Sequence, residues 1–274
     1  MVKQAFLTFV FVVCFGLGGC GTSSSGGIGG GTPPPAGVAG KWEIIFTSTQ
    51  NPSGSYPHTA IETNLTQAGS STFAGDQATF VIPFGALGID QPVGPLNPCG
   101  GLPQAAINGT LSGQNLSFTL IEIGSAGSYT VTGTATISSD GHTISGSYTA
   151  PAACGIAADA GTLNGTLVPF VSGTYTTVFD TGPGPTMTIS EDATHNLSVT
   201  GIYQGSSFTL SGAIVGGFLA LSGNIPGLGG VIYIADYLNP PLVSLVPAVN
   251  GMSTQAGEFL IFGPGASIGL ATKQ

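Results

Sequence analysis

The chain contains few residues that could perform acid–base chemistry. Its three histidines, His58, His142 and His195, are far apart, and each stands next to residues typical of turns. A catalytic triad or a zinc site needs such side chains to converge, and nothing in their spacing indicates convergence. We therefore expect each histidine to be an exposed turn residue, and the sequence predicts a protein that is not an enzyme.

The twelve carboxylates do not indicate a site either. Glu191 and Asp192 are the one adjacent pair, and with Asp180 they could form half of a calcium site, but the spacing matches no established calcium loop. Glu122 shares the strand parity of three apolar residues before it, so it is either an inward-facing carboxylate or, as we favour, the end of a strand. The sequence thus predicts no metal ion and no cofactor.

The composition excludes several classes of protein. Only 5% of residues are charged, and the three cations are all lysines, so the chain cannot build the basic groove that nucleic-acid binding requires. Coiled coils and helical bundles are also excluded, because they need many charged helix-forming residues and this chain has few. A hydrophobic content of 42%, with fifteen Phe and seven Tyr, is enough to bury a core.

The N-terminus has the parts of an export signal. Lys3 supplies a positive start, and about thirteen mostly apolar residues follow from Ala5 to Leu17, too few to cross a bilayer. The run ends in Leu17-Gly18-Gly19-Cys20, which resembles the lipobox of bacterial lipoproteins. The resemblance implies cleavage before Cys20 and attachment of diacylglycerol to its sulfur, so that acyl chains hold the protein to a membrane.

The residues after Cys20 indicate where the rest of the mature protein, the body (residues 40–274), would lie. Gly21 stands where enteric Gram-negative bacteria place Asp in lipoproteins of the inner membrane, which implies the outer membrane here, with the periplasmic or surface face left open. Residues 21–39 are nearly all Gly, Ser, Thr, Pro and Ala, a composition typical of a flexible tether. After cleavage the formal charge is about −10, so anionic headgroups repel the body.

Two cysteines remain in the body, Cys99 and Cys154, each in a loop rich in Pro, Gly or Ala. An even pair in an exported protein favours a disulfide. A redox pair is the alternative, but it lacks a Cys-x-x-Cys spacing and a basic neighbour. We predict that the bridge Cys99–Cys154 connects two long loops.

The rest of the chain has an all-β pattern. Runs rich in Thr, Val, Ile, Phe and Tyr alternate in polarity, as in Tyr129–Ile137, where Thr recurs at every second position through Thr136. Glycine-containing pairs suit tight hairpin turns; we expect such turns at Gly113-Gln114, Asp140-Gly141, Gly205-Ser206 and Gly216-Gly217. Gly182–Pro185 reads as a loop, because its prolines lack amide donors.

We expect antiparallel meanders that form two barrel-like or sandwich units, because such sheets must hide their edges. About eight strands fall between Lys41 and Val168, and about eight between Val171 and Gly263, with a joint at Val168-Pro169-Phe170. The alternatives are one sixteen-stranded unit and a membrane-spanning barrel, which the lipobox and the short later strands disfavour. The expected organisation is a signal peptide (1–19), a lipidated cysteine with its tether (20–39), and β domains at 40–169 and 170–274.

Two further resemblances bear on function. Gly40-Lys41-Trp42 resembles the Gly-x-Trp signature that opens lipocalins, which implies a ligand pocket, although the arginine that lipocalins pack over this Trp has no counterpart here. The body as a whole resembles Gly/Thr-rich β-repeat surface lipoproteins of Gram-negative bacteria, which implies no particular activity. The sequence therefore predicts a non-enzymatic structural or adhesive lipoprotein of the cell envelope; the alternative is a β-barrel module that binds a small apolar molecule or a glycan.

The cysteine pair gives a first prediction. Protein purified from the periplasm should have a mass about two hydrogens below that of the reduced chain, and reduction should lower the free energy of unfolding by roughly 4 kcal/mol, because the bridge closes a loop of about 56 residues. Mass spectrometry and urea unfolding, with and without reductant, measure both effects. A mass equal to that of the reduced chain would contradict the pairing.

Overall fold

The computed structural model describes residues 37–50, 58–76, 104–124, 127–155, 157–227, 229–238, 252–262 and 267–274. The described residues form sixteen β-strands: β1 (Gly40–Ser48), β2 (His58–Ala68), β3 (Thr72–Asp76), β4 (Gln104–Ser112), β5 (Asn115–Gly124), β6 (Gly127–Ile137), β7 (Thr143–Ala150), β8 (Asp159–Val168), β9 (Gly173–Phe179), β10 (Gly182–Glu191), β11 (Asn196–Tyr203), β12 (Ser206–Val215), β13 (Phe218–Ile225), β14 (Gly229–Tyr237), β15 (Phe259–Phe262) and β16 (Ile268–Lys273). The expected signal peptide, Cys20 and most of the tether lie outside the described residues.

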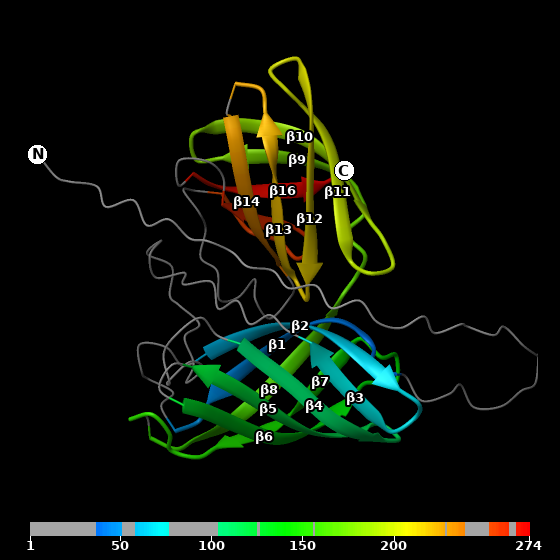
Figure 1. Cartoon of the computed structure of the whole chain (residues 1–274), viewed down its shortest axis with the longest axis vertical. Helices are drawn as coiled ribbons and strands as arrows, with labels where there is room; N and C mark the ends of the chain where they lie inside the picture. Colours follow the sequence, from blue (N-terminus) through cyan, green and yellow to red (C-terminus); the bar gives the residue numbers. More distant parts are fainter. Residues whose placement is uncertain are drawn as a thin grey trace, which may run out of the picture. The chain divides into compact units, whose positions relative to one another are not determined.

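The strands close into two antiparallel barrels, one of β1–β8 and one of β9–β16 (Figure 1). The first barrel closes where β1 pairs with β8, and the second where β16 pairs with β9. The predicted all-β fold of two barrel-like units is confirmed, and the alternative of one sixteen-stranded unit is wrong. Both barrels belong to one compact unit, Pro35–Gln274.

Each barrel has an apolar interior and a largely polar outer face. Along β6 the buried residues Tyr129, Val131 and Ile137 alternate with Thr132 and Thr134, which are exposed. Every second side chain of a strand points to the same face, so the threonine repeat lies outside and the apolar repeat fills the core. The described core forms two clusters, one inside each barrel.

Glycines on the inner face leave room for aromatic rings. Three of them stand opposite a phenylalanine of a neighbouring strand: Phe73 with Gly109, Phe118 with Gly133, and Phe208 with Gly201. A Cβ at any of these glycines would overlap the ring of its partner. The ring covers the bare backbone of the glycine, an arrangement that stabilises curved sheets. This pairing explains part of the high glycine content.

Three local expectations were wrong. The turn expected at Gly205-Ser206 is Gln204-Gly205, both at positive φ, as tight hairpin turns require. Gly182–Pro185 begins β10 and is not a loop; the pairing with β9 is irregular between Pro183 and Thr186, which accommodates residues without amide donors. The second set of strands continues past Gly263 to β16, which closes the barrel.

The glycine–ring pairs predict that Gly133→Ala lowers the free energy of unfolding by about 1–3 kcal/mol, because the added methyl group overpacks against Phe118. Gly230→Ala in β14 is the matched control, since nothing lies within 4 Å of its Cβ position, and it should change stability by less than about 0.5 kcal/mol. Urea unfolding compares the variants. Equal stability of the two would contradict the packing role of Gly133.

Candidate functional site

The two barrels begin in the same way. In the first, the indole nitrogen Nε1 of Trp42 donates a hydrogen bond of 2.8 Å to the carbonyl of Val38, four residues earlier. In the second, the hydroxyl of Tyr175 donates one of 2.9 Å to the carbonyl of Val171. Both aromatic side chains are fully buried. The first strand of each barrel is therefore anchored by one aromatic residue bonded to the segment that enters it.

The amide of each entering valine is bonded by the next strand. Val38 donates to Oε1 of Gln67, and Val171 donates to Oε2 of Glu191, both over 2.8 Å. The strand registers, in which Gly40 pairs with Leu65 and Gly173 with Ile189, place Gln67 and Glu191 at equivalent positions. The first barrel thus uses a neutral amide where the second uses a carboxylate.

That carboxylate forms a buried ion pair with the first barrel. Nζ of Lys41 lies 2.6 and 2.7 Å from the two carboxylate oxygens of Glu191, and the side chains are 1% and 0% exposed. Nδ1 of His195 lies 2.8 Å from Oε1 of the same residue, and Lys41 also stands 5.3 Å from the ring centre of Phe170. We call this the Lys41–Glu191 pair.

The environment shifts the pKa of both partners. Burial lowers the pKa of Lys41, although the hydrogen bond and the charge of Glu191 oppose the shift. Burial by itself would raise the pKa of Glu191, but hydrogen bonds from Lys41, the Val171 amide and His195 outweigh it, so the pKa lies below its ordinary value. Glu191 is therefore ionised at neutral pH, as an ion pair requires.

A second polar contact joins the barrels at the turn Gly216-Gly217, between β12 and β13. The amide of Gly217 donates to Oε2 of Glu62, and the amide of Gly216 donates to Oδ1 of Asn64 over 2.9 Å. Asn64 in turn donates from Nδ2 to the carbonyl of Ile214 over 3.2 Å. Gly216 has φ +55, and a Cβ there would lie 2.6 Å from the carbonyl oxygen of Trp42, so only glycine fits. This turn and the Lys41–Glu191 pair form what we call the seam.

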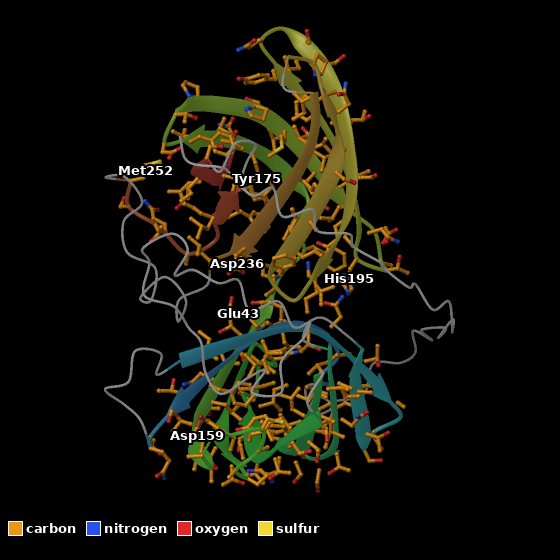
Figure 2. All side chains as sticks on the ribbon, turned by 60° about the vertical axis from the view of Figure 1, so that its left-hand side comes forward. Glu43, Asp159, Tyr175, His195, Asp236 and Met252 are labelled. Atoms are coloured by element: carbon orange, nitrogen blue, oxygen red, sulfur yellow. The ribbon has the colours of Figure 1, made fainter. Side chains whose placement is uncertain are left out.

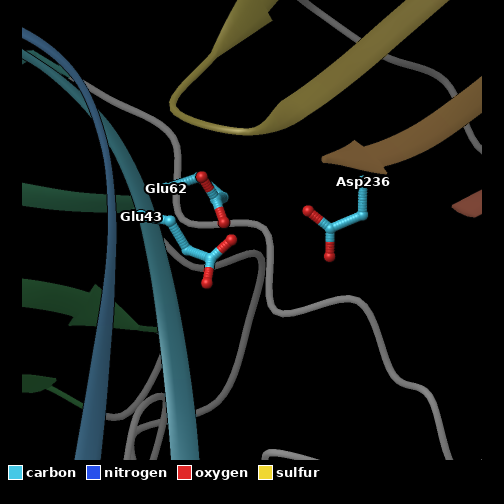
Figure 3. A group of neighbouring side chains, drawn as sticks. All are labelled: Glu43, Glu62 and Asp236. Carbon is cyan, nitrogen blue, oxygen red and sulfur yellow. The ribbon is translucent and has the colours of Figure 1, made fainter. Parts of the chain in front are cut away.

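Three carboxylates converge beside this turn: Glu43 of β1, Glu62 of β2 and Asp236 of β14 (Figure 3). Glu43 and Asp236 are also labelled in the view of all side chains (Figure 2). One carboxylate oxygen from each lies within 4.8 Å of the other two. The residues are 1%, 3% and 4% exposed, respectively. Among the described residues this acidic cluster is the one group of three acidic, histidine or cysteine residues close enough to share a metal ion.

Burial makes the acidic cluster electrostatically costly. It raises the pKa of Glu62 well above its ordinary value, and the charges of Glu43 and Asp236 raise it further, against the opposing amide of Gly217. Burial also raises the pKa of Asp236. Neither Glu62 nor Asp236 forms a salt bridge with any residue in the described part of the chain. Protons or a metal ion must therefore offset the negative charge here.

Sequence reasoning did not identify this cluster. Glu43 and Glu62 are register partners on neighbouring strands, and they face away from the interior that Trp42 occupies. On an isolated barrel that face would be open to water. The alternating pattern predicts the outward direction of both side chains. It does not predict that Glu62 lies against the Gly216-Gly217 turn, or that Asp236 of β14 lies close to both glutamates.

The acids singled out from the sequence serve other purposes. Oδ1 of Asp192 accepts hydrogen bonds from the amides of Thr194 and Asn196, over 2.8 and 2.9 Å, and so holds a turn. Oδ1 of Asp180 accepts a bond from the Ile268 amide over 3.3 Å. Glu191 is paired with Lys41, and in the described part of the chain Asp180, Glu191 and Asp192 do not form a group close enough to share a metal ion. The side chain of Glu122 lies outside the described part of the structure.

The histidines and cysteines have different outcomes. His142 is exposed in its turn, as expected, and lies 3.6 Å from Asp140. His195 also lies in a turn, but its side chain contacts Glu191 and is only 22% exposed, so the expectation of an exposed residue was wrong here. The side chain of His58 and the whole of Cys99 lie outside the described residues. Cys154 lies in the turn after β7, and its pairing with Cys99 stays a prediction.

Among the described residues, apolar side chains pack the interior of both barrels. The larger described cavity measures about 20 Å³ and lies in the first barrel, and the other measures about 10 Å³ in the second. Both are lined by apolar side chains. The larger has room for about one water molecule.

Comparison of the chain with protein-family models finds no match, and comparison with curated proteins finds no significant match. The case for a function therefore depends on the geometry and on the sequence motifs.

The equivalence of the two barrel starts predicts the effect of changing the Lys41–Glu191 pair. Glu191→Gln should lower the free energy of unfolding by about 3 kcal/mol at pH 7, because it leaves Lys41 buried without its counter-charge. Adding Lys41→Thr should restore stability to within about 1 kcal/mol of wild type. Gln67 is the first barrel's equivalent of Glu191, and Thr174 is the second barrel's equivalent of Lys41, so the double variant has at each site the residue of the other barrel.

Urea unfolding of Glu191→Gln, Lys41→Thr and the double variant gives a double-mutant cycle. Asp140→Asn is a control that removes an exposed carboxylate. A double variant as unstable as Glu191→Gln alone would contradict the pairing.

Proposed function

We propose that the protein is a lipid-anchored, non-enzymatic lipoprotein of the cell envelope with a structural or adhesive role. The observation that supports this best is the apolar core that the described side chains form inside each barrel. Small-molecule sites typically enclose about 300–1,000 Å³, whereas the larger described cavity is about 20 Å³. A barrel packed with its own side chains is suited to rigidity rather than to carrying a ligand.

The lipocalin-like alternative has less support. Trp42 is fully buried in the apolar core and bonded to Val38, so it acts as a packing residue at the closed start of the barrel. The apolar lining of the larger cavity offers no polar group to orient a small apolar ligand or a glycan.

Anchoring depends on the N-terminal motif. The lipobox ending at Cys20 supports attachment of acyl chains such as palmitate, and residues 21–39 would tether the body to the outer membrane. In the described part of the chain, no helix is long and apolar enough to pass through a membrane. We propose that the acyl chains provide the membrane attachment.

Metabolic labelling with an alkyne analogue of palmitate, in a Gram-negative host that expresses the full chain, tests the anchor. The wild-type chain should be labelled and should sediment with membranes. Cys20→Ala should lose both properties, because the thiol is the acyl acceptor. Cys14→Ala is the matched control in the preceding apolar run and should stay labelled. A labelled Cys20→Ala variant, or an unlabelled wild type, would contradict the proposal.

A further inference from the structure

We propose that Glu43, Glu62 and Asp236 bind one calcium ion, which connects the first barrel to the second. The three side chains come from β1, β2 and β14, so an ion held by all three would have ligands from both barrels. This site is independent of the lipid anchor and adds to the proposed function.

The spacing of the oxygens suits calcium. Calcium holds oxygen ligands at about 2.3–2.6 Å, so two of its ligands can be up to about 5 Å apart. The carboxylate oxygens of the acidic cluster lie within 4.8 Å of one another. Magnesium demands near-ideal octahedral positions and usually keeps several of its waters, so a site made mainly of protein carboxylates suits calcium better. The absence of histidine and cysteine from this cluster disfavours zinc and other softer metals.

Asp236 provides an independent indication of a ligand. Its Oδ1 atom is buried and has no hydrogen-bond partner among the described residues. Figure 3 shows the carboxyl group of Asp236 directed toward those of Glu43 and Glu62. A buried acceptor without a donor is costly, and a cation bound between the three carboxylates would remove that cost.

The composition limits what else could neutralise this cluster. The chain has three lysines and no arginine. Lys3 belongs to the expected signal peptide, Lys41 is paired with Glu191, and Lys273 lies at the end of β16 on the strand that closes the second barrel. Three carboxylates and one calcium ion leave a net charge of −1, whereas three ionised carboxylates alone would repel one another in a desolvated site.

The neighbouring backbone positions one ligand. The amide of Gly217 donates to Oε2 of Glu62 and so fixes the orientation of that carboxylate. Gly216 and Gly217 belong to the second barrel and Glu62 to the first. The Gly217 amide and the ion would therefore both bind the Glu62 carboxylate and connect the two barrels there. Calcium sites of exported modules have dissociation constants of about 10⁻⁴–10⁻³ M, and we expect an affinity in this range.

Calcium titration of the full chain, purified in detergent and stripped with EGTA, tests the site. Isothermal titration calorimetry should show one site per chain, and 10 mM CaCl2 should raise the unfolding temperature by about 3 °C or more over a KCl control of equal ionic strength. The fluorescence of Trp42 follows unfolding, since it is the one tryptophan of the chain and adjoins Glu43.

The variants Asp236→Asn and Glu62→Gln distinguish binding from simple charge repulsion. Each should be at least as stable as wild type without calcium, because it removes a buried charge, and each should lose the calcium-dependent shift. Asp180→Asn and Asp192→Asn are matched controls outside the cluster and should keep it. No shift in the wild type, an equal shift with MgCl2, or a shift retained in Asp236→Asn would each overturn the assignment.

Discussion

The shortage of cationic side chains is the constraint on which the structure between the barrels depends. With three lysines for twelve carboxylates, the chain cannot neutralise each buried acid with a basic partner. Lys41 is committed to Glu191, in a pair almost completely removed from water. Glu62 and Asp236 of the acidic cluster are buried and form no salt bridge with any residue in the described part of the chain, so protons or an ion from solution must offset their charge.

The second feature is the repetition of one barrel start. Val38, Gly40 and Trp42 have the same spacing as Val171, Gly173 and Tyr175, and both aromatic side chains bond to the valine carbonyl. The two barrel starts differ in the residue that accepts the hydrogen bond of the valine amide, which is Gln67 in the first barrel and Glu191 in the second. Gln67 suffices in the first barrel because its position makes no ion pair, whereas Glu191 also binds Lys41. With a carboxylate in place of the amide, Glu191 bonds both the valine amide of its own barrel and Lys41 of the first barrel.

Much of the fold follows from local patterns. The alternation of Thr with apolar residues in β6 and the glycine turn at Gly216-Gly217 predict strands, faces and hairpins, because these depend on neighbours in sequence. The prolines at the start of β10 predict a loop, but an irregular register tolerates them within the strand. The acidic cluster could not be predicted, because Asp236 is nearly two hundred residues from Glu43. Its three carboxylates come together across two barrels, which no strand pattern encodes.

In these features, polar contacts at the seam join two barrels with apolar cores into one compact unit. The most direct test is measurement of ¹⁵N relaxation for backbone amides of both barrels in solution. A connected body predicts one rotational correlation time shared by the amides of β1–β8 and β9–β16. Two shorter and different times, one for each barrel, would show that they tumble independently and would contradict the account.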